Sequence, residues 1–207
     1  MSSARVTWLH LAVAVRSMLV LTVILGIGYP LLVTGIGQAV FGAQADGSLV
    51  TDVSGEVIGS ALIGQSFTDA DGAPLPQYFQ PRPSAAGDGY DAGASGGSNL
   101  GSDNPDLVAV IQERRAAVAA FEGMAPADVP ADALTASASG LDPAISPEYA
   151  LLQVPRVTRV RDVPEGRVRA LVEATIAGRD LGYLGEPTVD VLDLNAALDD
   201  AAGGVSR

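Results

Sequence analysis

The hydrophobic pattern of the chain is dominated by one apolar segment near its N-terminus, which begins after Arg16 and ends before Asp46. The segment reads SMLVLTVILGIGYPLLVTGIGQAVFGAQA and contains no charged residue. About 20 apolar residues suffice to cross a bilayer as one helix. The pattern therefore predicts a single transmembrane helix over residues 17–42, followed by a folded domain over residues 46–207.

The charges on either side of this segment predict its orientation. Arg5 and Arg16 precede it, whereas all 24 carboxylates follow it. Basic flanks remain in the cytoplasm, so we expect a short cytoplasmic N-terminus (1–16) and an extracytoplasmic domain. A secretory signal peptide is the main alternative, because residues 43–45 (AQA) fit an A-x-A cleavage pattern. The apolar core of a signal has only about 7–15 residues, so the length favours an uncleaved anchor.

Small residues recur along one side of the predicted transmembrane helix. Gly26, Pro30, Thr34 and Gly37 are spaced three or four residues apart, so they share one helical face. Such a face lets a partner helix approach closely, and Pro30 is expected to kink the helix. The alternative is that glycine and proline are common in membrane helices whether or not a partner packs there.

Weaker patterns follow in the first half of the domain. Residues 57–67 (VIGSALIGQSF) are apolar and bounded by turn residues, which predicts a strand or a pair of short strands. Residues 69–104 are rich in Gly, Ser, Asp and Pro, and a segment of this length without regular structure is usually functional or disordered. A helix is then predicted from Pro105, with Asn104 as its N-cap and Gly123 as its C-terminal stop.

Two further helices are predicted in the second half. Ser146 is expected to cap a helix that passes through Gln153, and Pro155 is expected to bend or break it. Another helix is predicted to begin near Pro164 and to end within residues 178–182.

The last predicted strand covers residues 189–194 (VDVLDL), where apolar and polar residues alternate, and residues 195–198 are expected to add a turn. The fold class predicted from these patterns is a single N-terminal transmembrane helix plus one mixed α/β extracytoplasmic domain. That domain has few strands and long Gly/Ser/Pro-rich loops.

The composition of the chain removes most catalytic chemistries. Cysteine and lysine are absent, and the only histidine is His10, which precedes the apolar segment. A thiol nucleophile, a Schiff base, a Ser-His-Asp triad and a histidine metal site are therefore excluded from the domain. Carboxylate chemistry remains, with Asp142 and Glu148 as the candidate acid/base pair of a hydrolase. Ten arginines against 24 carboxylates make nucleic acid and anionic lipid poor partners for the domain.

One arginine interrupts the apolar stripe of the helix predicted after Asn104. Arg114 occupies a position on the same face as the apolar side chains at 107, 110, 111 and 118. Two interpretations remain open. The aliphatic stem covers apolar surface while the guanidinium stays in water, or the guanidinium pairs with a carboxylate elsewhere in the domain.

A glycine-rich loop precedes the same helix. Residues 95–101 read SGGSNLG, and backbone N–H groups of such a loop can cradle an anion. The phosphate-loop pattern with its lysine is not met, so the loop by itself is only a weak indication of an anion site.

Nearly the whole chain resembles one family, the C subunit of the Kdp potassium-transporting P-type ATPase. The matching segments occur in the family's order, and they are residues 64–67, 78–79, 82–85, 95–101, 104–105, 129–130, 139–143, 145–147, 156–157 and 184–187, with Asp132, Ser137, Gln153, Val189, Val191, Leu192, Leu194 and Asn195. The chain departs from the family pattern at Ser102, Ala144 and Asp190, where the family commonly has proline, histidine and asparagine.

The resemblance implies a non-catalytic accessory subunit of a high-affinity, ATP-driven potassium import pump in the cell (inner) membrane. Its partners would be a potassium-translocating subunit, an ATP-hydrolysing subunit and a very small membrane peptide. The family is described as a catalytic chaperone that assists assembly and raises the ATP affinity of the hydrolytic subunit. We expect no cofactor on the chain itself, and ATP only through the partner complex. The resemblance links a set of residues to nucleotide binding, namely Ser95, Gly96, Gly97, Ser98, Asn99 and Gln153.

The expected topology conflicts with direct nucleotide binding, because it places the loop and Gln153 outside the cytoplasm, where ATP is scarce. The alternative is an extracytoplasmic cap on the potassium-translocating subunit with no nucleotide contact. In that case Arg82, Asn99, Asp142 and Gln153 would fix long loops by hydrogen bonds instead of contacting a ligand. A free-standing extracytoplasmic binding module is a further alternative.

Overall fold

The computed structural model describes residues 3–52 and 54–201, with side chains from residue 6 onward. The chain divides into two compact units, residues 1–48 and 49–207. We call the described part of the first unit the anchor and that of the second the domain.

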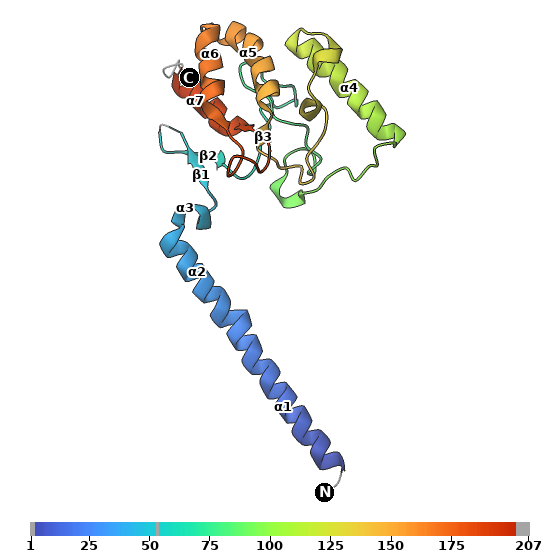
Figure 1. The fold of residues 1–207 in the computed structure, drawn as a ribbon, viewed down its shortest axis with the longest axis vertical. Helices are drawn as coiled ribbons and strands as arrows, with labels where there is room; N and C mark the ends of the chain where they lie inside the picture. Colours follow the sequence, from blue (N-terminus) through green and yellow to red (C-terminus); the bar gives the residue numbers. More distant parts are fainter. Residues whose placement is uncertain (1–2, 53, 202–207) are drawn as a thin grey trace. The chain divides into compact units, whose positions relative to one another are not determined.

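The anchor is a long helix (Figure 1, blue). It consists of α1 (Ser3–Val23), a π-helical turn (Ile24–Gly28) and α2 (Tyr29–Val40), and a short α3 (Gly42–Ala45) follows. The π turn lies one turn before Pro30, which has no N–H and whose ring would clash with the carbonyl four residues earlier. Widening the helix at that point accommodates the proline, and π turns of this kind are a recognised cause of local bends.

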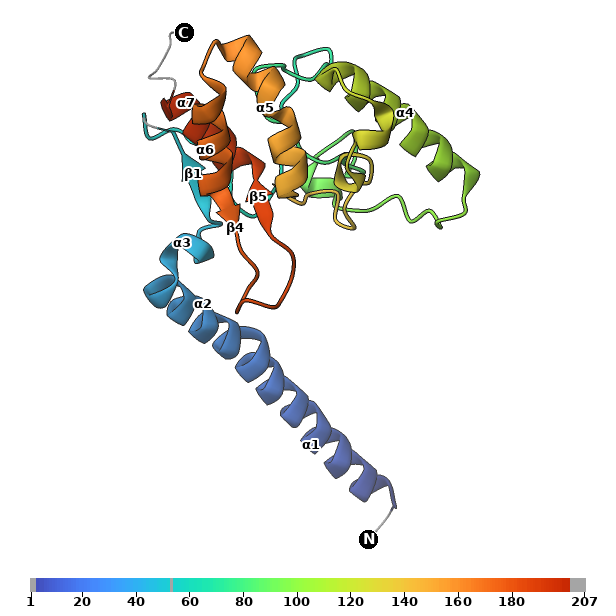
Figure 2. The same cartoon turned by 45° about the horizontal axis from the view of Figure 1, so that its top comes forward.

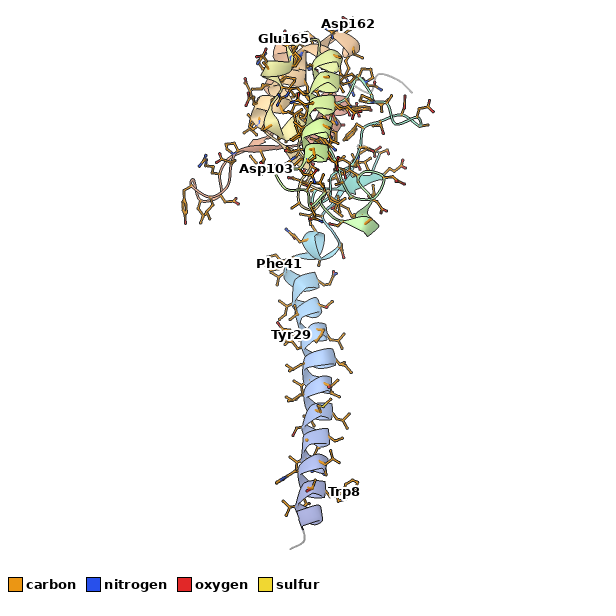
Figure 3. All side chains as sticks on the ribbon, turned by 90° about the vertical axis from the view of Figure 1, so that its right-hand side faces the viewer. Trp8, Tyr29, Phe41, Asp103, Asp162 and Glu165 are labelled. Atoms are coloured by element: carbon orange, nitrogen blue, oxygen red, sulfur yellow. The ribbon has the colours of Figure 1, made fainter. Side chains whose placement is uncertain are left out.

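The anchor exposes apolar side chains on all sides. Residues Val6–Val40 are long and apolar enough to cross a membrane, with a mean hydropathy of 2.2, and the most apolar window of this segment is not buried by any described residue. Figure 3 shows Trp8, Tyr29 and Phe41 projecting from the helix at successive levels. A rise of 1.5 Å per residue makes these 35 residues about 52 Å long, more than the bilayer core of about 30 Å. The helix also continues past Arg16, the N-terminal edge of the predicted span, to Ser3.

The domain mixes helices with short strands. An antiparallel hairpin pairs β1 (Leu49–Thr51) with β2 (Val57–Ser60). A separate antiparallel sheet has the order β3-β5-β4, formed by Ala144–Ile145, Thr188–Asp190 and Ile176–Ala177. The longer helices are α4 (Pro105–Glu122), α5 (Pro147–Arg161), α6 (Glu165–Thr175) and α7 (Val191–Ala201), and short 3-10 turns cover Ala92–Ala94, Pro126–Asp128 and Ala131–Ala133.

The core lies where α5, α6 and α7 pack around β5. Figure 1 shows these helices side by side, and Figure 2 shows the β4–β5 hairpin beside α6 and α7. Each fully buried aliphatic side chain stabilises the fold by about 1.5–3 kcal/mol relative to exposure. The aliphatic side chains with at most 2% exposure come from all of these elements, and they include Ile145, Val154, Val157, Val168, Val172, Val189, Leu194 and Leu198.

The helix starts predicted from capping residues are confirmed. The Asn104 side chain accepts a hydrogen bond from the Asp106 N–H (2.8 Å), and Gly123 ends α4 in the left-handed conformation with φ of 74°. The Ser146 hydroxyl accepts from the Tyr149 N–H (3.0 Å) at the start of α5. These caps satisfy backbone groups that a helix end leaves unpaired.

Of the two outcomes predicted for Pro155, a bend or a break, the break does not occur, because α5 continues to Arg161. An internal proline costs about 3 kcal/mol in a helix. Here its neighbours anchor the helix on both sides: Val154 and Val157 are fully buried, and Arg156 is 2% exposed. Tertiary packing therefore outweighs the lost backbone bond.

Two element boundaries near the C-terminus also differ from the prediction. α6 ends at Thr175 instead of within 178–182, because Ile176–Ala177 pairs with β5 as strand β4. The predicted strand over 189–194 is only Thr188–Asp190, and α7 begins at Val191. The buried residues of α7 have helical spacing, and they are Val191, Leu192, Leu194, Asn195 and Leu198. Residues 189–194 alone also alternate between apolar and polar, which is why they were predicted as a strand.

Candidate functional site

A segment without regular secondary structure, residues 76–80, is held by side chains of α5 and α7. We call it the clamped segment. Each of its five backbone carbonyls accepts a hydrogen bond from a side chain of one of these helices. The pairs are Pro76 and Tyr78 with Arg156, Gln77 with Arg161, Phe79 with Asn195, and Gln80 with Gln153. Buried carbonyls need such partners, so the two helices replace the sheet that this segment lacks.

Two side-chain amides bind consecutive residues of the clamped segment in the same manner. The Gln153 Oε1 accepts from the Gln80 N–H (2.6 Å), and its Nε2 donates to the Gln80 carbonyl (3.0 Å). The Asn195 Oδ1 accepts from the Phe79 N–H (2.9 Å), and its Nδ2 donates to the Phe79 carbonyl (3.0 Å). Gln153 is fully buried and Asn195 is 2% exposed. Both amides therefore act as backbone mimics inside the core.

A buried ion pair completes this network. The Arg156 Nε lies 3.0 Å from both carboxylate oxygens of Glu122, and its Nη2 donates to the Gln153 Oε1 (2.7 Å). The guanidinium also stacks 4.5 Å above the Phe121 ring. Burial raises the pKa of Glu122 and lowers the pKa of Arg156, and the attraction between the two charges opposes both shifts. The pair joins α4 and α5 to the clamped segment.

The structure places Gln153 and the SGGSNLG loop in different environments. The Ser95 hydroxyl (3.0 Å) and the Gly96 N–H (2.8 Å) both donate to the Ser139 carbonyl, so the loop packs on the turn at 137–140. Gly97 lies close to that turn, since an added Cβ would lie 3.0 Å from the Ala138 carbonyl oxygen, a tighter contact than most Cβ atoms make.

Ser95 and residues 98–101 of this loop are exposed, and Asn99 has a left-handed backbone with φ of 53°. Within residues 3–52 and 54–201, no hydrogen bond joins residues 95–99 to Gln153. A nucleotide on the loop could contact the Gln153 amide only by displacing Gln80 or Arg156. The nucleotide-binding role of these residues stays a prediction.

Arg82 ties the loops after the clamped segment to the segment before α5. Its Nη1 lies 3.0 Å from the Asp142 carboxylate, and its Nε and Nη2 donate to the Thr135 carbonyl. The Tyr90 hydroxyl donates to the Arg82 carbonyl (2.7 Å). Asp142 also accepts from the Ala144 N–H (3.0 Å), and no bond joins it to Glu148 in the part of the chain that the structure describes. This arrangement is that of residues that fix loops by hydrogen bonds.

A cleft of about 430 Å³ opens beside Arg82. Its walls come from the loops on either side of the clamped segment, from α4 and from the start of α5. The charged and aromatic lining residues are Arg82, Arg114, Phe67, Tyr90 and Tyr149, and the smaller ones include Pro74, Pro81, Pro83, Ala117 and Val118. The sequence left two interpretations of Arg114 open, a guanidinium in water or one paired with a carboxylate. The structure gives it a single bond, from Nη1 to the Leu134 carbonyl (3.1 Å), and no ion pair within the described residues.

Among the described residues of the anchor, no other helix packs against its small-residue face. Gly26 lies inside the π turn, whereas Pro30, Thr34 and Gly37 belong to α2. A Cβ added at Gly37 would meet nothing within 4 Å, so that position leaves room for close approach of another helix. Use of this face by a partner helix stays a prediction.

The sequence alone did not predict how many side chains of α5 and α7 bind the clamped segment. Glu122, Arg161 and Asn195 were not singled out as site residues, and the family match drew attention to Arg156 only as part of a motif. The available signal was a polar residue on an otherwise apolar helical face, as for Arg156 and Asn195. Their partner lies more than 70 residues away in the sequence, and no local pattern identifies it.

Comparisons with known proteins cover nearly the whole chain. Residues 11–200 match the family described as K+-transporting ATPase, c chain (KdpC). A potassium-transporting ATPase KdpC subunit from Kineococcus radiotolerans is 57% identical over 185 residues, which cover 89% of this chain and 90% of the relative. The subunit of that name from Caulobacter vibrioides is 52% identical over 191 residues, 92% of each chain. The one from Mycobacterium tuberculosis is 54% identical over 190 residues, 90% of this chain and 95% of the relative.

This extent of similarity includes the anchor, the clamped segment, the cleft and the SGGSNLG loop. The resemblance noted in the sequence is therefore confirmed, and the chain belongs to the KdpC family, the c chain of the K+-transporting ATPase.

Proposed function

We propose that this chain is a non-catalytic accessory subunit of a high-affinity potassium import pump. Residues 17–42 cross the cell (inner) membrane, residues 1–16 are cytoplasmic, and residues 46–207 form the extracytoplasmic domain. Family membership, the exposed apolar helix and the charges that flank it support this proposal. The ATP-hydrolysing site lies on another subunit.

Its partners are a potassium-translocating subunit, an ATP-hydrolysing subunit and a small membrane peptide. The chain assists their assembly and raises the ATP affinity of the hydrolytic subunit through protein contacts, without holding nucleotide itself. The domain caps the potassium-translocating subunit, and the face of Gly26, Pro30, Thr34 and Gly37 packs on a partner helix.

The proposal that this chain makes no contact with nucleotide is supported mainly by the surroundings of Gln153. The amide of Gln153 has a partner for its oxygen and for its nitrogen, and the side chain is fully buried. A ligand hydrogen bond to that amide would leave Gln80 or Arg156 with an unpaired buried group, which costs about 1–3 kcal/mol for each group.

The exposed part of the SGGSNLG loop provides the test. In the purified pump complex, Ser98→Ala with Asn99→Ala removes two exposed polar side chains of the loop that form no hydrogen bond within the described residues, while the Ser95 hydroxyl keeps its bond to the Ser139 carbonyl. We expect the KM for ATP to remain within about twofold of the wild-type value, because no binding energy is lost. A complex lacking this subunit should show a raised KM for ATP. A several-fold rise of KM in the double variant, with the subunit present at full stoichiometry, would contradict the proposal.

A further inference from the structure

The cleft beside Arg82 holds a cationic side chain whose charge is not neutralised within the domain. Arg114 extends from α4 into this cleft, is half-buried, and has only the Leu134 carbonyl as a hydrogen-bond partner among the described residues. A guanidinium carries five N–H donors and stays protonated in proteins. Burial lowers the pKa of Arg114, while the neighbouring Glu113 opposes that shift without forming an ion pair.

The other groups in the cleft favour a negatively charged occupant. Arg82 has its carboxylate partner, Asp142, and contributes a second guanidinium to the wall. Gln80 is unavailable, since its Nε2 donates to the carbonyls of Phe67 and Leu75. Nothing in residues 3–52 and 54–201 accepts a hydrogen bond from the Tyr149 hydroxyl. Burial raises the pKa of Tyr149, so this hydroxyl remains a donor. The cleft thus offers donors and no free carboxylate.

The remaining walls are apolar. Phe67, Pro74, Pro81, Pro83 and Val118 line the cleft around the two arginines. A volume of about 430 Å³ is within the range of sites that bury one ligand group, and such sites combine apolar walls with a few placed polar groups. The domain as a whole has ten arginines against 24 carboxylates, so a general attraction for anions does not explain an open basic cleft. The lining fits the side chains of a polypeptide segment, with a carboxylate meeting Arg114.

We propose that this cleft receives an acidic segment of another pump subunit, and that a carboxylate of that segment pairs with Arg114. The inference rests on the proposed function, because it names the chemistry of one contact through which the subunit acts. A paired, partly desolvated Arg–carboxylate contact gives both affinity and specificity at an interface. The clamped segment fixes the wall that carries Arg82, so the cleft is formed before its partner arrives.

The absence of lysine from the chain allows a direct test. Arg114→Lys introduces the only side-chain amine of this subunit. A zero-length carbodiimide reagent joins an amine to a carboxylate only when the two are in contact. The experiment treats the complete, purified pump complex with this reagent and identifies cross-linked peptides by mass spectrometry. We expect position 114 to be joined to an aspartate or glutamate of another subunit.

Two variants make the cross-linking result decisive. Arg82→Lys places an amine beside Asp142, 3.0 Å from the present guanidinium, and must give a cross-link within the chain. Arg169→Lys places one beside Glu165 on the exposed face of α6 and should give no link to a partner. With the first control positive, the absence of any partner cross-link at position 114, or links only within this chain, would overturn the proposal.

The second measurement is retention of the subunit on the complex. Arg114→Gln keeps a donor for the Leu134 carbonyl but removes the charge, and Arg169→Gln removes the same charge outside the cleft. We expect the first variant to dissociate about tenfold faster or more in a salt wash, and the second to match the wild type. Equal retention of both variants would contradict the proposal.

The cleft could instead bind a free anion, and a third measurement distinguishes this occupant from an acidic segment. Inorganic phosphate that stabilises the purified full-length chain against heat, but not its Arg114→Gln variant, would assign the cleft to a free anion when no partner cross-link forms. That result would overturn the proposal of an acidic segment. It would leave the ATP test at Ser98 and Asn99 unaffected, so the two proposals can fail separately.

Discussion

Replacing Gln153 with leucine separates a structural role from a ligand role more sharply than any other single change. The substitution keeps a long side chain in a fully buried site and removes every hydrogen bond of the amide. It leaves three groups without their partner. These are the Gln80 N–H, the Gln80 carbonyl and one N–H of Arg156.

The magnitude follows from the burial of these groups. Gln80 is 8% exposed and Arg156 is 2% exposed, so water does not replace the lost bonds. An unsatisfied buried group costs about 1–3 kcal/mol, and the three groups together cost about 3–6 kcal/mol because neighbouring effects are not additive. A shift of about 2–4 °C in Tm per kcal/mol in a domain of this size gives a fall of about 6–24 °C.

The assay is thermal or urea unfolding of the purified full-length chain in detergent, followed by far-UV circular dichroism. Tryptophan fluorescence does not report on the domain, because the only tryptophan is Trp8 in the anchor. Gln112→Leu is the matched control, since Gln112 is exposed on α4 and the same substitution there removes no buried bond. We expect Gln112→Leu to unfold within about 0.5 kcal/mol of the wild type.

The second part of this test measures the KM for ATP of the assembled pump. A Gln153→Leu subunit should lower the yield of assembled complex, while the complex that does assemble should keep its KM for ATP. A structural role for Gln153 is contradicted if Gln153→Leu unfolds within about 1 kcal/mol of the wild type and raises the KM for ATP several-fold. That result would mean that the amide meets nucleotide and that its bonds in the core are dispensable.

Three further substitutions test other parts of the network by the same unfolding measurement. Asn195→Leu removes the equivalent clamp on Phe79 and should cost about 2–4 kcal/mol, and a value under about 0.5 kcal/mol would show that the segment is held elsewhere. Glu122→Ala leaves Arg156 as an uncompensated buried charge and should cost about 3–5 kcal/mol, whereas a neutral effect would show that the pair is solvated. Gly140→Ala should destabilise the domain and speed amide hydrogen exchange in residues 95–99. Its φ is 67°, and the added Cβ would lie 2.7 Å from two backbone atoms. Unchanged exchange there would contradict this packing.

The parts of the fold that the sequence predicted well are those with local causes. The starts of α4 and α5 follow from Asn104 and Ser146, because a cap bonds to backbone groups two or three residues away. The end of α4 follows from Gly123 for the same reason. The anchor follows from composition alone, since an unbroken apolar segment has few other structures available.

The parts that the sequence predicted poorly depend on contacts between distant residues. Pro155 has no local reason to be tolerated. Its neighbours Val154 and Val157 are buried where α5 packs on α6 and β5, and this packing explains the intact helix. Strand β4 consists of two residues and exists because β5 pairs with it, so no local pattern marks it. At the start of α7, apolar and polar residues alternate over residues 189–194, as they do in a strand. The helical spacing of the apolar residues becomes clear only when the residues up to 198 are included.

The candidate site divides in the same way. Gln153 and the SGGSNLG loop were identified by resemblance, but their surroundings were not, since Gln80 lies 73 residues from Gln153. A polar residue in a matching motif is equally expected for a ligand contact and for a clamp on the backbone. The difference lies in burial and in bonding partners, which only the folded structure provides.

The decisive measurement for the proposed topology is the side of the membrane on which the SGGSNLG loop lies. Ser98→Cys and, separately, Ser3→Cys are made in this cysteine-free chain, and intact cells producing the complete pump are treated with a membrane-impermeant thiol reagent. We expect labelling at position 98 and none at position 3, which would place the domain outside the cytoplasm and require its effect on ATP affinity to pass through partner subunits. Labelling at position 3 and not at position 98 would contradict the proposed topology and place the domain on the side where ATP is available.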